Sequence, residues 1–151
     1  MEEWKVVPLE ELEGRYEVST YGRIRRVARI SYLKDGRKRQ LEEKILTPHI
    51  HPKGYVIINL AQQDRSVTYK MHRLVAVTFI ENPLVLPEVN HKDEDKSNNN
   101  VNNLEWCTHQ YNSVYGTRLQ RLGEQTSKRQ KGRKLSEETK RRISEALKLR
   151  K

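Results

Sequence analysis

Residues 89–112 read VNHKDEDKSNNNVNNLEWCTHQYN, and this stretch carries most of the information about the fold of the chain. Its middle is polar, since positions 98, 99, 100, 102 and 103 are all asparagine. Asparagine favours turns and loops because its side chain bonds the nearby backbone. The stretch therefore predicts a long loop. The residues after it predict a helix from about His109 to Leu122 that is broken at Gly116.

Upstream of this stretch, the apolar spacing changes from that of strands to that of a helix. Residues 55–60 are rich in β-branched side chains and predict a strand, with 66–71 as its partner across a turn. In residues 72–79 apolar side chains recur at a spacing of four, which predicts a helix. The Asn82-Pro83 pair that follows is a helix stop.

The first fifty residues indicate short strands separated by turns. Residues 23–27 alternate charged and apolar side chains directly after the turn signal Tyr21-Gly22. Residues 29–39 are polar and basic around Asp35-Gly36, which indicates a hairpin tip or a loop. We therefore expect a β-rich module at the N-terminal end.

The C-terminal residues predict a linker and then a helix. Residues 123–132 contain no apolar side chain, which is typical of a linker. Ser136 is a good N-cap, and Glu137 and Glu138 suit the positive end of the helix dipole. The predicted final helix is too short and too charged to be stable alone, so we expect it to dock on a partner.

The composition limits the size of the core and the kind of metal site. Only 34% of the 151 residues are hydrophobic and 33% are charged, which predicts small modules arranged along a partner. The single cysteine, Cys107, excludes a disulfide framework and a CxxC zinc site. The longest apolar run, 74–80, is too short to span a bilayer, and the N-terminal residues do not resemble a signal peptide. We therefore expect a cytoplasmic protein with no membrane partner.

The net charge of +10 lies almost entirely at the C-terminal end. Residues 117–151 hold thirteen Lys or Arg against four Glu, a net +9. Such a run can be a solvated face or a disordered tail, but a cluster of this size favours contact with nucleic-acid phosphates. Binding to an acidic membrane surface is an alternative, although the stripe of Ile143, Ala146 and Leu147 lacks residues that insert well.

His91 is the strongest candidate for chemistry on such a partner. Phosphodiester hydrolysis needs a base for water, a divalent ion for the leaving oxygen, and cations for the phosphates. A neutral histidine suits the first role near pH 7. If His91 has this role, its other ring nitrogen should donate to a carbonyl or amide oxygen.

Three parts of the sequence resemble known modules. VNHKDEDKSNNNVNNLEW resembles the HNH nucleases, in particular phage and intron-encoded homing endonucleases that nick DNA. Trp4 with residues 16–19 and 22–24 is similar to the small module that often precedes these nucleases. Residues 132–140, GRKLSEETK, are similar to a DNA-binding helix repeat attached to homing endonucleases.

The resemblance implies an α+β fold that is elongated and modular. A ββα-metal nuclease module would follow a short-stranded β-rich module and precede a basic helical tail. In the nuclease module, strands 88–92 and 104–107 would flank the loop. The expected parts are a β-rich module with a potential DNA contact at 1–66, the nuclease at 67–122, a basic linker at 123–135 and a DNA-binding helix at 136–151.

The resemblance also implies the roles of four residues. His91 would be the general base, and Asn103, nine residues before Asn112, would orient it. Asn90 and Asn112 would face a single Mg²⁺ or Mn²⁺ ion. Several relatives carry Asp immediately before the catalytic His, where this chain has Asn90. An amide oxygen brings no charge, so two asparagine ligands predict a weak metal site that relies on the DNA phosphate.

Basic residues are the expected DNA contacts, since arginine and lysine bind phosphates and guanine edges. The candidates are Arg23, Arg25, Arg26, Lys128, Arg129, Arg133, Lys134, Lys140 and Arg141. The other histidines have weaker claims to a role in chemistry. His72, at a helix start, is interpreted as structural, and His49 with His51 alone would make a poor metal site.

Together these observations predict a site-specific, metal-dependent endonuclease that nicks double-stranded DNA. We expect a monomer or weak dimer that needs no small-molecule cofactor. One alternative is a sequence-tolerant phage HNH nuclease. Another is a DNA-binding protein with a weak or inactive nuclease module, for which Asn90 is the main support.

Overall fold

In the computed structural model the chain has the mixed α+β fold that the sequence predicts. The structure describes residues 1–12, 14–33, 35–62, 65–131 and 136–148. The chain divides into two compact units, Met1–Ser113 and Val114–Lys151. The predicted module boundary at residue 66 falls inside the first unit.

The N-terminal part of the first unit is an antiparallel sheet of short strands. Its order is β1-β2-β3-β6, formed by β1 (Trp4–Val6), β2 (Tyr16–Ser19), β3 (Ile24–Arg26) and β6 (Lys44–Ile45). A 3₁₀ turn, η1 (Glu10–Leu12), lies between β1 and β2. Gly22, in the turn between β2 and β3, has a φ of 75°, which glycine adopts without a Cβ penalty.

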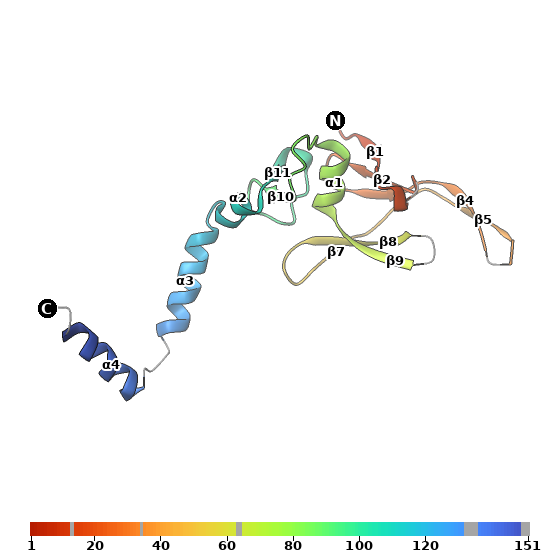
Figure 1. Ribbon diagram of the computed structural model, residues 1–151. Helices are drawn as coiled ribbons and strands as arrows, with labels where there is room; N and C mark the ends of the chain where they lie inside the picture. Colours follow the sequence, from red (N-terminus) through yellow and green to blue (C-terminus); the bar gives the residue numbers. More distant parts are fainter. Residues whose placement is uncertain (13, 34, 63–64, 132–135, 149–151) are drawn as a thin grey trace. The chain divides into compact units, whose positions relative to one another are not determined.

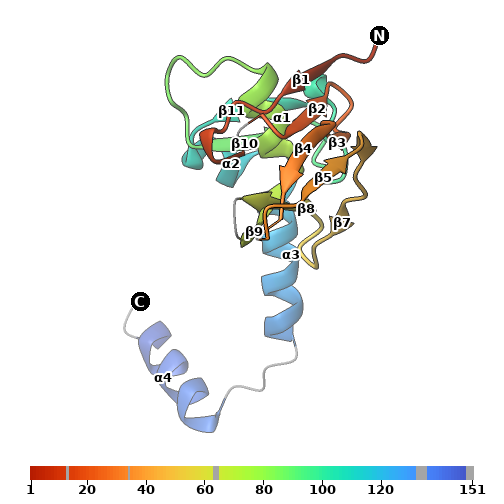
Figure 2. The same ribbon diagram turned by 90° about the vertical axis from the view of Figure 1, so that its right-hand side faces the viewer.

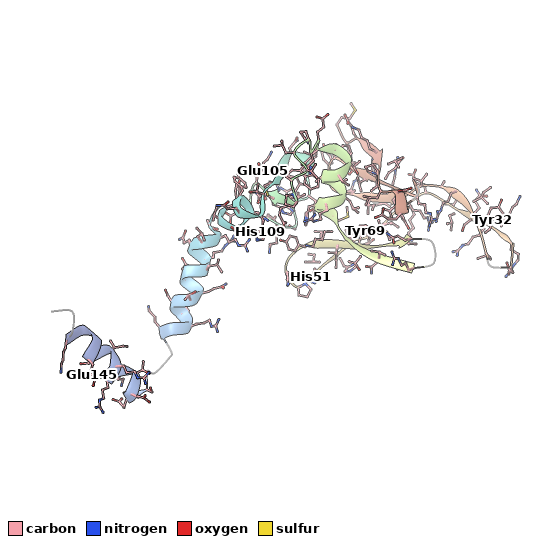
Figure 3. The ribbon with its side chains drawn as sticks, viewed as in Figure 1. Tyr32, His51, Tyr69, Glu105, His109 and Glu145 are labelled. Atoms are coloured by element: carbon pink, nitrogen blue, oxygen red, sulfur yellow. The ribbon has the colours of Figure 1, made fainter. Side chains whose placement is uncertain are left out.

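The basic stretch after β3 forms a two-stranded hairpin, as one of the two predictions had it. The hairpin consists of β4 (Arg29–Tyr32) and β5 (Lys38–Leu41), with Tyr32 opposite Lys38. It projects from the sheet that contains β2 (Figures 1 and 2). Tyr32, labelled in Figure 3, is exposed. The hairpin therefore presents both basic and apolar side chains to solvent.

A second sheet leads to the first long helix. Its order is β7-β8-β9, with β7 (His49–Ile50), β8 (Val56–Gln62) and β9 (Arg65–Lys70). The pairing of β8 with β9 confirms the two predicted strands. Ile58 and Leu60 are buried while Asn59 is exposed, the alternation expected of a strand with one covered face.

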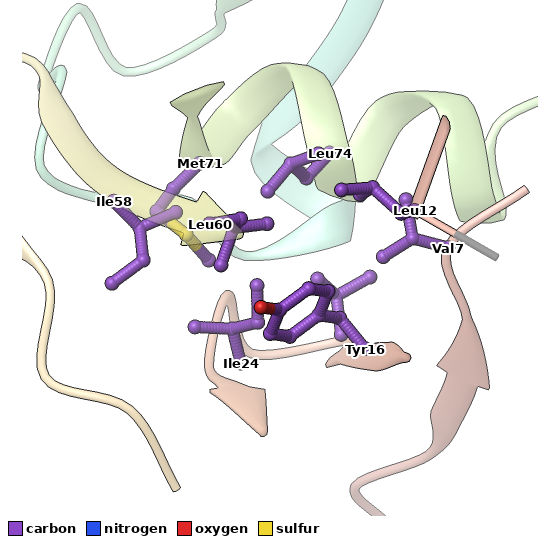
Figure 4. Packing of buried hydrophobic residues seen from close by; sticks show 9 residues of the cluster. Val7, Leu12, Tyr16, Ile24, Ile58, Leu60, Met71 and Leu74 are labelled. Carbon is purple, nitrogen blue, oxygen red and sulfur yellow. The ribbon is translucent and has the colours of Figure 1, made fainter. Parts of the chain in front are cut away.

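Helix α1 (Met71–Phe79) begins directly after β9 and packs against both sheets (Figure 1). Its residues Met71 and Leu74 enter the main core, shown in Figure 4. The other members of this core are Val7, Leu12, Tyr16, Val18, Ile24, Ile58 and Leu60. Burying side chains of this size contributes about 1.5–3 kcal/mol each. The N-terminal sheet and α1 therefore stabilise each other.

A second core on α1 holds the hairpin that corresponds to residues 89–112. Val75 and Ala76 of α1 cluster with Val89 and Leu104. The hairpin consists of β10 (Glu88–His91) and β11 (Leu104–Cys107), and the loop between them ends in the 3₁₀ turn η2 (Val101–Asn103). These bounds confirm the two predicted strands to within one residue.

The chain after β11 is helical for more of its length than predicted. Helix α2 (His109–Val114) ends before Gly116, which has a φ of 58°, and α3 (Arg118–Lys131) follows. The break at Gly116 is therefore confirmed. The predicted linker is wrong for residues 123–131, which belong to α3; residues 132–135 lie outside the described residues. This segment is rich in Glu, Gln, Lys and Arg, which are good helix formers even without an apolar face.

Helix α4 (Glu137–Lys148) confirms the predicted helix start. The Ser136 hydroxyl accepts a hydrogen bond from the backbone N–H of Thr139 at 3.2 Å, the pattern of an N-cap. The side chains of Ala146 and Leu147, two members of the predicted apolar stripe, lie outside the described part, and Ile143 is exposed. Within the described ranges, no helix is long and apolar enough to cross a membrane.

Candidate active site

The candidate site lies at the end of the β10–β11 hairpin. The antiparallel register pairs Asn90 with Glu105 and His91 with Leu104. Val89 and Leu104 anchor the two strands in the core against α1. This burial fixes the register, because a slip of one residue would turn every side chain to the other face. As a result, Asn90 and His91 are both held in buried positions.

An asparagine of the connecting loop lies against the His91 ring. The ring Nε2 is 3.3 Å from Oδ1 of Asn99, and both side chains are buried. An amide oxygen only accepts hydrogen bonds, so the neutral ring carries its hydrogen on Nε2 and keeps a lone pair on Nδ1. Asn99 Nδ2 donates to the Ser97 carbonyl at 3.0 Å, which fixes the orientation of the amide.

Asn103, which the resemblance assigns to orient His91, instead holds the loop. Its Nδ2 donates to Asp93 Oδ1 at 2.9 Å and to the Asn98 carbonyl at 2.8 Å. Its Oδ1 accepts from the Asp93 N–H at 3.1 Å. These bonds tie the beginning of the loop to its end. The loop contains five asparagines, and no spacing rule indicates which amide reaches the ring, so the role of Asn99 could not be predicted from the sequence.

Two aromatic rings lie beside the His91 ring. His72 of α1 meets it edge-on with the ring centroids 4.9 Å apart, and the Tyr55 centroid is 6.4 Å away. Burial, and to a lesser extent His91, lowers the pKa of His72 to about 3, so this ring is neutral at neutral pH. Its Nδ1 is buried without a hydrogen-bond partner among the described residues. The burial agrees with the structural role expected for His72, but its contact with His91 could not be predicted from the sequence.

Burial also lowers the pKa of His91 itself. The hydrogen bond to Asn99 and the carboxylates of Asp93 and Asp95 act in the opposite direction and are smaller causes. The net effect favours the neutral imidazole at neutral pH. A neutral ring with a lone pair on Nδ1 is the form that can take a proton from water.

Asn90, which precedes His91 in the chain, and Glu105, opposite it on β11, form a pair of side chains rich in oxygen. Asn90 Nδ2 donates to Glu105 Oε1 at 2.8 Å, so Oδ1 of Asn90 is the amide atom that a cation would use. Amide and carboxylate oxygens suit a hard cation such as Mg²⁺. Glu105 therefore adds a negative charge that the interpretation with two asparagine ligands lacked. Over the described ranges, no three His, Cys, Asp or Glu side chains gather as a metal-binding group.

Asn112, the second predicted metal ligand, lies on α2 and is half-buried. The start of α2 is tied to β10 by an ion pair between His109 Nδ1 and Glu88 Oε1, 3.7 Å apart, if the histidine is protonated. Residues three apart share a face of a helix, so Asn112 lies on the side of α2 that His109 occupies. Figure 3 labels Glu105 on β11 and His109 at the start of α2.

A basic groove, which the sequence did not indicate, borders the Tyr55 ring. The Lys70 and Lys96 ammonium groups lie 4.9 and 4.6 Å from the centroid of the Tyr55 ring. Such cation–π contacts hold a charge in place without neutralising it. A groove of about 350 Å³ is lined by His51, Lys53, Tyr55, Ile57, Thr68 and Lys70. These residues come from β8, β9 and the loop between β7 and β8, which only the pairing of the sheet brings together.

The three arginines proposed as DNA contacts directly before β3 and on it have acidic or backbone partners. Arg23 forms an ion pair with Glu2, and Arg25 lies 2.6 Å from Glu17. Arg26 donates to the backbone carbonyl of residue 42 at 2.9 Å. The charges of Arg23 and Arg25 are therefore partly neutralised by carboxylates. As DNA contacts they remain a prediction.

The predicted DNA contacts of the tail lie on exposed helix surfaces where the structure describes them. Lys128 and Arg129 are in the last turn of α3. Lys140 and Arg141 are on α4, paired with glutamates three and four positions away at 2.6 and 3.2 Å. Exposed pairs of this kind contribute little to stability, so they leave these cations available. Arg133 and Lys134 lie outside the described residues.

Three families match consecutive parts of the chain. The NUMOD4 motif matches residues 2–61, the HNH endonuclease family matches 69–114, and the NUMOD3 motif matches 132–148. The second match contains every residue of the candidate site from Lys70 to Asn112.

Curated relatives include viral endonucleases. The chain is 45% identical over 83 residues to the uncharacterized HNH endonuclease L245 of Acanthamoeba polyphaga mimivirus. It is 34% identical over 110 residues to the DNA endonuclease I-HmuI of Bacillus phage SP01, and 34% identical over 76 residues to the H-N-H endonuclease F-TflII of Escherichia phage T5. These matches cover 54%, 73% and 49% of this chain, and 25%, 55% and 39% of the three relatives.

The fold is also similar to a solved structure, that of I-HmuI, described as DNA binding and cleavage by an HNH homing endonuclease. The TM-score is 0.54 at 30% identity, and the match covers 95% of this chain and 66% of that one. The chain thus spans about half or less of the curated relatives named above. It carries an HNH endonuclease domain between a NUMOD4 motif and a NUMOD3 motif, and it is homologous to the phage endonucleases I-HmuI and F-TflII.

Proposed function

We propose that the protein is a metal-dependent HNH DNA endonuclease of the homing type that nicks one strand, with His91 as general base. The observation that carries this proposal is the state of His91. Its ring is buried, its pKa is lowered, and its Nε2 is engaged by Asn99 Oδ1, which leaves the Nδ1 lone pair for a proton. This is the arrangement that base catalysis near pH 7 requires.

In the proposed reaction, Nδ1 of His91 takes a proton from water, and the oxygen of that water attacks the scissile phosphorus. The bond to the 3′ oxygen breaks in line, and this oxygen takes a proton from solvent water, which leaves a 3′ hydroxyl and a 5′ phosphate. A divalent cation, when bound, supplies positive charge at the phosphate and the leaving oxygen. Asn90, Asn112 and Glu105 would hold that cation, and Asn99 keeps the His91 ring in its reactive tautomer.

We place the DNA backbone along the basic groove beside Tyr55. Lys70 and Lys96 bring two positive charges to the Tyr55 ring, which neighbours both His72 and His91. Phosphates are the natural partner of such a pair of cations. One chain contains one candidate site, so a single protomer would cut one strand. A double-strand break would need two protomers.

A second candidate function is DNA binding with little or no cleavage. The observation in its favour is Asn90, an uncharged residue in the position of a metal ligand, in a site without a cluster of three acidic or imidazole ligands among the described residues. Glu105 supports cleavage instead, because it supplies a carboxylate at 2.8 Å from the Asn90 amide.

Nicking of supercoiled plasmid separates these functions. We expect conversion to the open-circular form with Mg²⁺ or Mn²⁺, and none after the divalent ion is removed with EDTA. DNA retardation measured on the same samples reports binding. Binding without conversion at any Mg²⁺ or Mn²⁺ concentration would contradict the proposed function and leave the second candidate.

A further inference from the structure

The turn between β2 and β3 lies directly against Asn99, the residue that orients His91. A Cβ built on Gly22 would lie 2.7 Å from Asn99 Cβ and 2.8 Å from its carbonyl oxygen. Real Cβ atoms do not approach other atoms this closely, so only glycine fits at position 22 without displacing Asn99. The N-terminal sheet and the active-site loop are therefore in backbone contact at this point.

Two further features make this contact a rigid one. The Val101 N–H, two residues after Asn99, donates to the Thr20 carbonyl of the turn at 2.8 Å. Within the turn, the buried Ser19 hydroxyl accepts from the N–H groups of Tyr21 and Arg23 at 3.3 and 3.1 Å. The turn is thus fixed from inside and bonded to the loop on one side of Asn99.

We propose that this turn, residues 19–23, is a positioning element for catalysis: it presses on Asn99 and so sets the orientation of His91. The inference rests on the proposed function, because it assigns a catalytic role to His91. Its steps are the close approach of Gly22 to Asn99, the burial of Asn99, and the 3.3 Å contact between Asn99 Oδ1 and His91 Nε2. The N-terminal module then has a role besides the predicted DNA contact, because the orientation of the His91 ring depends on it.

Gly22→Ala tests the proposal, with Gly14→Ala as the matched control. Both glycines have positive φ, 75° and 69°, so both substitutions strain the backbone alike. Only the new methyl at 22 meets Asn99; at 14 the nearest atom is a Val6 carbon at 3.9 Å. Gly22→Ala should lower the single-turnover cleavage rate at saturating DNA by about tenfold to a hundredfold, since a displacement on the order of 1 Å costs this much. DNA affinity and the rate of Gly14→Ala should stay within about threefold of the parent.

A double-mutant cycle distinguishes positioning from general damage to the fold. In an Asn99→Ala background the amide no longer orients the ring, so Gly22→Ala should reduce the rate by no more than about twofold further. Ser19→Ala loosens the turn without adding an atom and decides the matter if Gly22→Ala does not fold. It should lower the rate about three- to tenfold in the parent and have no such effect beside Asn99→Ala.

Two results would overturn the inference while the proposed function stands. One is a parent chain that cleaves while Gly22→Ala, or Ser19→Ala in its place, cleaves as fast as the parent. The other is a loss of rate that persists in full in the Asn99→Ala background. A parent chain that binds DNA and does not cleave it contradicts the proposed function itself.

Discussion

A single contact determines the tautomer of His91. Because Asn99 Oδ1 only accepts, the ring hydrogen stays on Nε2 and Nδ1 keeps its lone pair. The neighbouring His72 ring has a pKa of about 3 and is uncharged at neutral pH. His91 therefore packs against a neutral ring rather than a charged one. This environment suits a base that is neutral before the reaction and cationic after it has taken a proton.

A substitution at Asn90 tests whether this residue is a metal ligand. Asn90→Asp adds a charged oxygen beside Glu105, so it should lower the Mg²⁺ concentration for half-maximal cleavage by about tenfold, or about 1.4 kcal/mol. Without metal, the lost hydrogen bond to Glu105 should lower the free energy of unfolding by about 1 kcal/mol. A metal titration of cleavage and a urea titration with EDTA measure the two effects.

Asn59→Asp is the matched control for that experiment. Asn59 is exposed on β8, and its Oδ1 accepts from Thr68 Oγ1 at 2.6 Å, a bond that aspartate preserves. The control adds the same charge outside the site and should leave the metal titration unchanged. If Asn90→Asp also leaves the titration unchanged, or if both variants shift it equally, Asn90 is not a metal ligand.

At the scale of elements, the sequence predicted the hairpin and the break at Gly116 well. The strands around His91 follow from the resemblance to the HNH nucleases, whereas β8 with β9 follows from β-branched residues on either side of a turn. The α1 helix follows from apolar residues four positions apart. These features depend on local patterns, which a single sequence contains.

Three features of the structure could not be predicted from the spacing of apolar residues. The second half of α3 was predicted as a linker because it lacks apolar residues, although helix propensity alone favours a helix there. The contact of Asn99 with His91 depends on the path of a loop with five asparagines. The approach of Gly22 to Asn99 depends on tertiary packing between segments 77 positions apart in the sequence. Periodicity does not report such contacts.

Along the whole chain, most of the net positive charge lies in a different segment from the candidate active-site residues. Residues 132–151 hold eight Lys or Arg, whereas every candidate catalytic or metal-binding residue lies at or before Asn112. We therefore predict that a chain ending at Lys131, which keeps α3 whole, still nicks DNA at high protein concentration. If about four of the eight cations contact phosphate, the slope of log affinity against log salt should flatten by roughly three to four units.

A full-length chain with Lys140, Arg141 and Arg142 changed to glutamine is the control for that truncation. It keeps the length of the tail and removes three cations, so its slope should flatten by at most about 2.7 units. Salt titrations of DNA binding measure both slopes, and thermal unfolding checks that the first unit stays folded. A truncated chain with the salt slope of the parent would show that the tail does not bind phosphates.

His91→Ala tests whether His91 is the general base. Single-turnover cleavage and DNA affinity should be measured on the same substrate at saturating Mg²⁺, with His109→Ala, on the exposed start of α2, as the control. We predict that His91→Ala lowers the cleavage rate by about a hundredfold or more, while its DNA affinity stays within about threefold of the parent. Cleavage by His91→Ala within about tenfold of the parent rate would contradict the account, because the base would then be another group.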